Sequence, residues 1–225
     1  MQSKQLSLTH LAAAAREPDA EQPPLLILAH GVGANEQDLM GLAPYIDPRF
    51  MVVSVRAPRR YQYGGFSWFD IHWQANGFSI DTAQAEEGWK LLQRFTREAV
   101  AAYGADPARV YLAGFSQGAI TSLGATLSDP ELVAGTVVMS GRWMPEIAPQ
   151  TDQAAIAGKP LLVVHGEQDN VIPVRYGREI RDYLQTLPVK LTYHEYRMGH
   201  EVSMDSLHDV TVWLRDQLDA GRAQK

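Results

Sequence analysis

Short apolar runs separated by longer helical patterns constrain the fold of this 225-residue chain more than any other feature. The predicted strands are residues 25–29, 51–55, 110–113, 136–139, 161–164 and 191–196. Most of these runs are continuous rather than alternating, which is typical of strands buried on both faces. Helical patterns between several of them indicate an α/β fold, in which helices cover both faces of a mostly parallel central sheet.

Helical patterns accompany these strands at residues 36–45, 82–103, 117–127, 174–186 and 203–218. Asp81 and Ser203 are expected to be N-caps, because their side-chain oxygens can accept hydrogen bonds from first-turn amides. No internal repeat is visible, and proline and glycine are spread as turn signals rather than gathered in a linker. We therefore expect residues 1–225 to form a single domain.

The charge balance disfavours polyanionic partners. The formal net charge is -6, which repels phosphate backbones and anionic lipids unless a local basic patch overrides it. The tight basic cluster of Arg56, Arg59 and Arg60 is interpreted as a solvated loop, so nucleic-acid binding is not expected. The chain contains no cysteine, which excludes disulfides, thiolate metal sites and a cysteine nucleophile.

The N-terminal segment does not look like a targeting signal. Residues 1–20 lack the basic start and the long apolar stretch of a signal peptide. No segment approaches the roughly 18 apolar residues that are needed to span a bilayer. We expect a soluble, cytoplasmic protein without a transmembrane segment.

A serine motif between a strand and a helix indicates nucleophilic catalysis. Gly114-Phe115-Ser116-Gln117-Gly118 follows a predicted strand and precedes a helical pattern, which is the context of a nucleophile elbow. A plain Gly-Ser turn is the alternative. We predict Ser116 as the nucleophile, and a serine hydroxyl then needs a base, an acid that orients the base, and donors for the oxyanion.

The oxyanion donors are expected in two places. The predicted strand at 25–29 ends in His30-Gly31-Val32-Gly33. In folds with a nucleophile elbow, a loop at such a strand end supplies one amide donor to the oxyanion, and the Val32 amide is the candidate. The Gln117 amide is the second candidate, because the free amides and the dipole at a helix N-terminus favour an anion.

The acid and the base are expected in two later loops. Asp169 follows the predicted strand at 161–164, at the carboxyl edge where the sites of open α/β sheets lie. Glu167 and Asp152 are the alternative acids. His200 follows the predicted strand at 191–196 and is the predicted base. The order Ser116, Asp169, His200 is that of α/β hydrolases rather than of chymotrypsin or subtilisin.

The other histidines give no metal site. His30 and His165 stand at strand ends and are expected to be structural. A zinc site with His200, Glu201 and His208 would lack the His-Glu-x-x-His spacing, so neither a metal nor a cofactor is predicted.

Residues 56–79 are expected to form a long irregular stretch rich in aromatic residues and glycine, and such loops often carry function. The predicted contacts to an acyl chain, from this stretch and from later strand-end loops, are Trp68, Phe69, Trp143, Met144, Val171 and Ile172. Plain core packing is the alternative for these side chains. An apolar strip around the stretch could serve a homodimer or a membrane-facing substrate entry.

Several motifs together resemble the phospholipase/carboxylesterase family over nearly the whole chain. They are Leu28-Ala29-His30-Gly31-Val32-Gly33-Ala34-Asn35-Glu36, Arg56-Ala57-Pro58, Trp68-Phe69, the serine motif, Ser140-Gly141, His165-Gly166-Glu167-Gln168-Asp169-Asn170-Val171-Ile172-Pro173 and Gly199-His200. The resemblance implies an α/β-hydrolase fold without a large cap domain. It also implies a triad of Ser116, Asp169 and His200, with Val32 and Gln117 as the oxyanion donors.

Two positions depart from the family pattern. Ala119 stands where a second glycine often follows the elbow, and Ala34 stands where an aspartate often follows His-Gly-x-Gly. Both favour a bacterial-type carboxylesterase over a dedicated protein depalmitoylase. We therefore expect a serine carboxylesterase that cleaves short- to medium-chain small-molecule acyl esters through an acyl-enzyme. The alternatives are acyl-protein thioesterase or lysophospholipase activity, and a non-catalytic hydrolase-like protein that binds a ligand.

Overall fold

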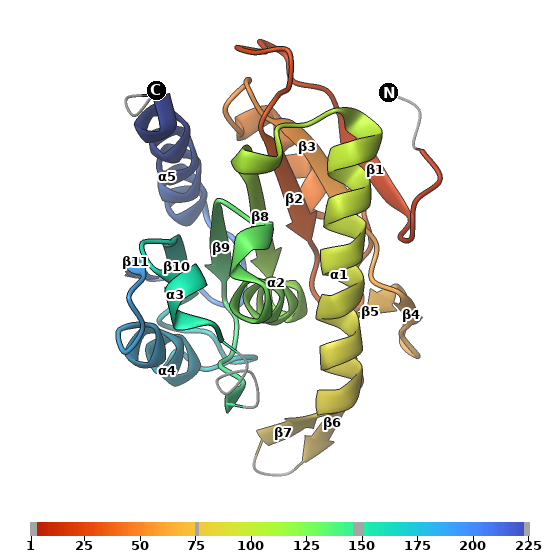
Figure 1. The fold of residues 1–225 in the computed structure, drawn as a ribbon. Coiled ribbons are helices and arrows are strands. Elements are labelled where there is room, and N and C mark those ends of the chain that lie inside the picture. Colours follow the sequence, from red (N-terminus) through yellow and green to blue (C-terminus); the bar gives the residue numbers. More distant parts are fainter. Residues whose placement is uncertain (1–3, 75–76, 146–150, 223–225) are drawn as a thin grey trace.

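The computed structural model describes residues 4–74, 77–145 and 151–222. Its centre is a seven-stranded sheet with the order β1-β3-β2-β8-β9-β10-β11 (Figure 1). β1 pairs antiparallel with β3, and every other neighbouring pair in this sheet is parallel. The mostly parallel sheet predicted from the sequence is confirmed. Its strands are β1 (His10–Ala13), β2 (Leu25–Ala29), β3 (Met51–Val55), β8 (Val110–Phe115), β9 (Gly135–Met139), β10 (Pro160–Gly166) and β11 (Lys190–Tyr196).

Helices cover both faces of the sheet, as predicted, and Figure 1 shows α1 and α2 in front of it. Side chains of α1 to α4 share one core cluster with one face of the strands, whereas η1 and α5 share a second cluster with the other face. The helices are η1 (Leu39–Tyr45), α1 (Thr82–Tyr103), η2 (Pro107–Arg109), α2 (Gln117–Ser128), η3 (Pro130–Leu132), α3 (Gln153–Ile156), α4 (Arg175–Leu184) and α5 (Met204–Arg222).

The two cores explain why the strands read as continuous apolar runs. In β2, Leu25 and Ile27 belong to the first cluster, and Leu26 and Leu28 belong to the second. All four side chains are buried. Successive side chains of a strand point to opposite faces, so a strand with a core on each side has no solvent-facing positions.

Where the sequence suggested an irregular stretch at residues 56–79, the described residues form two short antiparallel strand pairs, or hairpins. β4 (Arg59–Arg60) pairs with β5 (Phe66–Ser67), and β6 (Ile71–Gln74) pairs with β7 (Gly77–Ile80). The β6–β7 hairpin projects beyond the N-terminal end of α1 (Figure 1). Its base is closed by a hydrogen bond of 3.1 Å from the Asp81 amide to the Asp70 carbonyl.

Most helix boundaries follow the predicted ones. Asp81 caps α1 by accepting from the Gln84 amide at 3.0 Å, and Ser203 accepts from the Ser206 amide at 3.2 Å beside the start of α5. The segment predicted as a helix at 36–45 is the 3-10 helix η1, which begins at Leu39. β1 and α3 were not predicted, because elements of four residues are too short to show a period.

Three kinds of feature are absent from the described residues: a large cap domain, a membrane-spanning helix and a group of side chains that could hold a metal ion. The described residues contain no large cap domain over the sheet. No helix in the described ranges is both long enough and apolar enough to cross a membrane. Within the same ranges, no group of three histidine, aspartate or glutamate side chains could hold a metal ion.

Candidate active site

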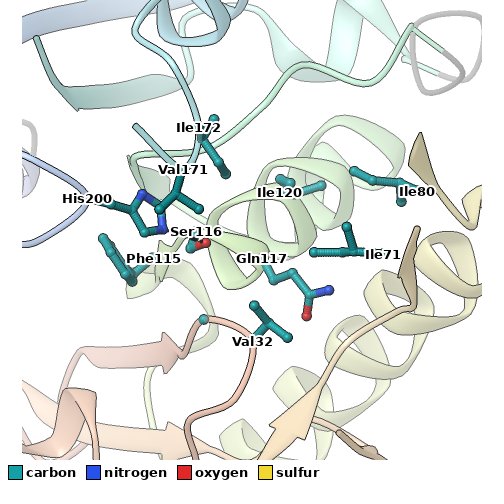
Figure 2. Close-up of a pocket in the computed structure, with 11 residues that line it drawn as sticks. Val32, Ile71, Ile80, Phe115, Ser116, Gln117, Ile120, Val171, Ile172 and His200 are labelled. Atoms are coloured by element: carbon teal, nitrogen blue, oxygen red, sulfur yellow. Dashed lines mark hydrogen bonds between the residues drawn. The ribbon is translucent and has the colours of Figure 1, made fainter. Parts of the chain in front are cut away.

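Ser116 lies on a strained turn between β8 and α2. Its φ of 55° and ψ of -118° are unusual for a residue with a side chain. A Cβ atom on Gly114 would lie 2.1 Å from the Gly118 carbonyl oxygen, and one on Gly118 would lie 2.0 Å from the Ala29 carbonyl oxygen. The flanking glycines are therefore required by the close approach of the backbone, and the turn directs the serine into the pocket shown in Figure 2.

His200 joins Ser116 to Asp169. Its Nε2 lies 2.9 Å from Ser116 Oγ, and its Nδ1 lies 2.7 Å from Asp169 Oδ2. The three residues come from the loops after β8, β10 and β11, which all end at the same edge of the sheet. The imidazole also packs on Phe115, with 4.8 Å between the ring centroids.

The Asp169 carboxylate is buried and fully engaged. Oδ2 accepts from His200, and Oδ1 accepts from the amides of Val171 at 2.9 Å and Ile172 at 2.8 Å. Burial raises the pKa of Asp169, but the hydrogen bonds from His200, Ile172 and Val171 outweigh burial and bring the pKa below its ordinary value. The carboxylate is therefore ionised at neutral pH.

The alternative acids lie elsewhere. Glu167 is exposed to solvent. Asp152 caps α3, where its carboxylate accepts from the amides of Ala154 and Ala155. Of the three carboxylates considered in the sequence, Asp169 is the one that the structure brings to His200.

His30 and His165 are buried at the ends of β2 and β10. In His30, Nδ1 donates to the Gly31 carbonyl at 2.6 Å and Nε2 accepts from the Ala57 amide at 3.0 Å. In His165, Nε2 donates to the Ile172 carbonyl at 2.7 Å, and Nδ1 has no hydrogen-bond partner among the described residues. Burial lowers the pKa of both rings, so both are neutral near pH 7.

An apolar cavity of about 250 Å³ opens at Ser116. In Figure 2, Ser116 and His200 lie at one end of it, and Ile71 and Ile80 from the β6–β7 hairpin lie at the other. The remaining lining residues are Gly31, Val32, Phe115, Gln117, Ile120, Val171 and Ile172.

The residues predicted to contact an acyl chain fall into two groups. Val171 and Ile172 line the cavity. Trp68 and Phe69 are buried in the core, Met144 is buried as well, and Trp143 stacks on Tyr183 with 3.5 Å between the ring centroids. These four do not line the cavity at Ser116.

The cavity is also lined by residues that were not predicted from the sequence. Ile120 is four residues after Ser116, so it lies on the same side of α2, and this spacing could have revealed it. Ile71 and Ile80 are direct cross-strand partners in the β6–β7 hairpin. No sequence signal placed them at the site, because the hairpin itself was not predicted.

The two expected oxyanion donors stand at the same cavity. Gln117 is the first residue of α2, where amides have no carbonyl within the helix to bind. The Val32 amide makes no hydrogen bond to the described residues. Val32 and Gln117 both line the cavity beside Ser116 (Figure 2).

Comparisons with known proteins agree with this architecture. Acyl-protein thioesterase 1 of Kluyveromyces lactis is 25% identical over 211 residues, which cover 86% of this chain and 92% of that protein. A probable carboxylesterase of Arabidopsis thaliana, SOBER1-like, is 27% identical over 222 residues, which cover 92% of this chain and 84% of that protein. The crystal structure of esterase PE8 is 29% identical with a TM-score of 0.80, and the match covers 95% of this chain and 99% of that one.

In this chain a serine lies at the turn from a strand of the mostly parallel sheet into a helix, and two later loops bring an aspartate and a histidine to it. This is the arrangement of the α/β hydrolases. The sequence model of the phospholipase/carboxylesterase family matches residues 11–218, and the chain belongs to this family. It is a serine hydrolase with esterase or thioesterase activity.

Proposed function

We propose that this protein is a serine carboxylesterase in which Ser116, His200 and Asp169 form the catalytic triad. The observation that carries the proposal is the continuous series of hydrogen bonds from Asp169 through His200 to Ser116, which ends at an apolar cavity. Asp169 accepts the Nδ1 hydrogen of His200, so Nε2 presents a lone pair to the serine hydroxyl.

Catalysis then proceeds in two acyl-transfer steps. His200 Nε2 takes the proton of Ser116 as Oγ attacks the carbonyl carbon, and the imidazolium formed is stabilised by ionised Asp169. His200 next gives this proton to the leaving alkoxide, which produces the alcohol and an acyl-enzyme on Ser116. Water, deprotonated by His200, attacks the acyl carbon. The bond to Ser116 Oγ then breaks, His200 returns the proton to Oγ, and the carboxylic acid leaves.

The amides of Val32 and Gln117 stabilise the oxyanion in both steps. Support comes from their place at the cavity and from the free first-turn amide of α2, where the helix dipole favours negative charge. Among the described residues, no aspartate, glutamate, lysine or arginine side chain lines the cavity.

The size of the cavity supports short- to medium-chain acyl groups. An engineered protein cavity of about 150 Å³ accepts benzene. At the same volume per non-hydrogen atom, the cavity of about 250 Å³ takes about ten such atoms. The lining by Ile71, Ile80 and Ile120 suits an unbranched hydrocarbon chain. The family match over residues 11–218 also supports one functional domain.

Thioester hydrolysis is the second candidate, favoured by the similarity to the acyl-protein thioesterase of Kluyveromyces lactis. The same residues perform it, with a thiolate as the leaving group. Phenyl butyrate and S-phenyl thiobutyrate differ only in the leaving atom, so the ratio of their kcat/KM values separates the two preferences.

The test is hydrolysis of both compounds by the wild type and by Ser116→Ala. Ser140→Ala is the matched control, because Ser140 is also buried, also has a positive φ, of 52°, and its hydroxyl has no partner among the described residues. We expect turnover by the wild type and Ser140→Ala, and only the background rate with Ser116→Ala. Turnover by Ser116→Ala at the wild-type rate would refute the proposal.

A further inference from the structure

A short segment connects the two candidate oxyanion donors. Residues 66–69, which we call the strap, run from the β4–β5 hairpin to the base of the β6–β7 hairpin. We propose that the strap, through Trp68 and the side chain of Gln117, holds the Val32 and Gln117 amides at the spacing that the oxyanion requires. This inference rests on the proposed function, and it makes Trp68 a positioning residue rather than a substrate contact.

The strap holds the Val32 loop on both sides of Val32. Before Val32, the indole Nε1 of Trp68 donates to the His30 carbonyl at 3.0 Å. After Val32, the Gly33 amide donates to the Phe66 carbonyl at 2.9 Å, and the Phe66 amide donates to the Ala34 carbonyl at 2.9 Å. The backbone that carries the Val32 amide is therefore fixed to the strap at three points.

The strap holds Gln117 through its side chain. Gln117 Oε1 accepts from the Trp68 amide at 2.9 Å, and Gln117 Nε2 donates to the Phe69 carbonyl at 2.6 Å. Figure 2 shows this side chain directed away from Ser116. A carboxamide is suited to this position because it offers one acceptor and one donor group, which match the amide and the carbonyl of the strap.

These contacts are fully buried. Trp68 is 0% exposed, and Gln117 and Phe69 are each 1% exposed. A polar group that loses its partner in such surroundings has no water to replace it, so the paired geometry is strongly favoured. Gly88 of α1 packs closely against the strap, since a Cβ atom there would lie 3.3 Å from the Trp68 carbonyl oxygen.

Val32 and Gln117 belong to different elements, a loop after β2 and the start of α2, so their spacing depends on what connects them. The oxyanion develops only in the transition state, and a displaced donor therefore lowers kcat while KM changes little. Removal of a whole oxyanion donor costs about 10²- to 10³-fold in kcat. Displacement of one should cost less, about tenfold.

Two variants remove strap contacts and leave both backbone amides in place. Trp68→Phe removes the indole donor to His30, and Gln117→Met removes both side-chain hydrogen bonds with a side chain of similar length. Trp89→Phe is the matched control, because Trp89 is a buried tryptophan of α1 whose Nε1 has no hydrogen-bond partner among the described residues. It loses the same atoms without losing a hydrogen bond.

The measurements are kcat and KM for p-nitrophenyl butyrate, and the Ki of an alkyl trifluoromethyl ketone, whose adduct with a serine carries an oxyanion. Rates are expressed per site labelled by a fluorophosphonate at saturation, so that unfolded protein is not counted. We expect kcat to fall about tenfold in Trp68→Phe and in Gln117→Met, with Ki rising in parallel and KM within about twofold of the wild type. Trp89→Phe should keep the wild-type kcat and Ki.

Wild-type kcat and Ki in both strap variants would overturn the inference, and so would equal losses in Trp68→Phe and Trp89→Phe. An inactive wild-type protein, or an active Ser116→Ala, would instead refute the proposed function. The two failures are therefore distinguishable.

Discussion

Gly118 lies directly against Ala29, and a Cβ atom on this glycine would be 2.0 Å from the Ala29 carbonyl oxygen. The contact packs the first turn of α2 on the end of β2, next to the turn that carries Ser116. We expect Gly118→Ala to destabilise the fold by about 3 kcal/mol or more, because two rigid backbones would have to separate.

Urea unfolding of Gly118→Ala measures this effect. The control is Gly41→Ala in η1, since a Cβ atom on Gly41 meets nothing within 4 Å. Equal midpoints for the two variants would contradict the packing described for the elbow.

Replacement of Asp169 by asparagine should remove activity without removing structure. The asparagine oxygen can keep the hydrogen bonds from the Val171 and Ile172 amides, so its NH₂ group would face His200. His200 would then carry its proton on Nε2 and could not accept the proton of Ser116. We expect kcat to fall about 10⁴-fold in Asp169→Asn, as in serine proteases with the same change.

The control for this experiment is Glu167→Gln, which alters the exposed neighbouring carboxylate. Steady-state kinetics with p-nitrophenyl butyrate should give near wild-type kcat for the control. A comparable loss in both variants would mean that Asp169 has no special role.

The acyl-chain preference should depend on the end of the cavity formed by the β6–β7 hairpin. Ile71→Phe adds bulk at the end of the cavity away from Ser116, so we expect kcat/KM for octanoate esters to fall at least tenfold relative to acetate esters (Figure 2). Leu191→Phe, on half-buried Leu191 of β11 outside this cavity, is the control. An unchanged ratio in Ile71→Phe would exclude this end of the cavity as the acyl site.

Buried neutral histidines should make the fold sensitive to acid. Burial lowers the pKa of His165 although Asp169 and Glu195 act in the opposite direction, and burial lowers the pKa of His30 as well. Below the unfolded value of about 6.5, the unfolded chain therefore binds more protons than the folded one. The free energy of unfolding falls as the pH drops from this value toward the lowered pKa, by up to about 1.4 kcal/mol per pH unit for each ring.

His165→Gln tests this pH dependence, because a glutamine can still donate to the Ile172 carbonyl but cannot be protonated. We expect urea unfolding between pH 7.5 and pH 5.5 to show a shallower fall in the variant than in the wild type, with the contribution of His30 remaining. His208→Gln, which removes an exposed imidazole, is the control. Identical slopes for His165→Gln and the wild type would be evidence against a buried neutral ring.

Much of the sheet could be predicted from the sequence because two-sided burial leaves a direct signal. β2 and β3 have the predicted bounds, and α1 has the predicted bounds of 82–103. β1 was missed because it is a four-residue edge strand, and its side chains are mostly half-buried. The pairs β4–β5 and β6–β7 were missed because their strands have only two or four residues and lie outside the main sheet.

Some residues of the candidate site could be predicted from the sequence, and others could not. Ser116, Asp169 and His200 each follow a predicted strand, and the ends of parallel strands meet, so their approach could be anticipated. The buried position of Trp68 could not be anticipated. In the sequence, an aromatic loop residue that contacts substrate cannot be distinguished from one that donates to the His30 carbonyl from within the core. Ile71 and Ile80 reach the cavity only through the register of their hairpin.

The most direct test of the central proposal is the site at which a fluorophosphonate reacts, determined by mass spectrometry of digested protein. We expect one adduct per chain, located on Ser116 and absent from Ser116→Ala, while Ser140→Ala is labelled like the wild type. An adduct on another residue, or labelling of Ser116→Ala at the wild-type rate, would contradict the assignment of Ser116 as the nucleophile.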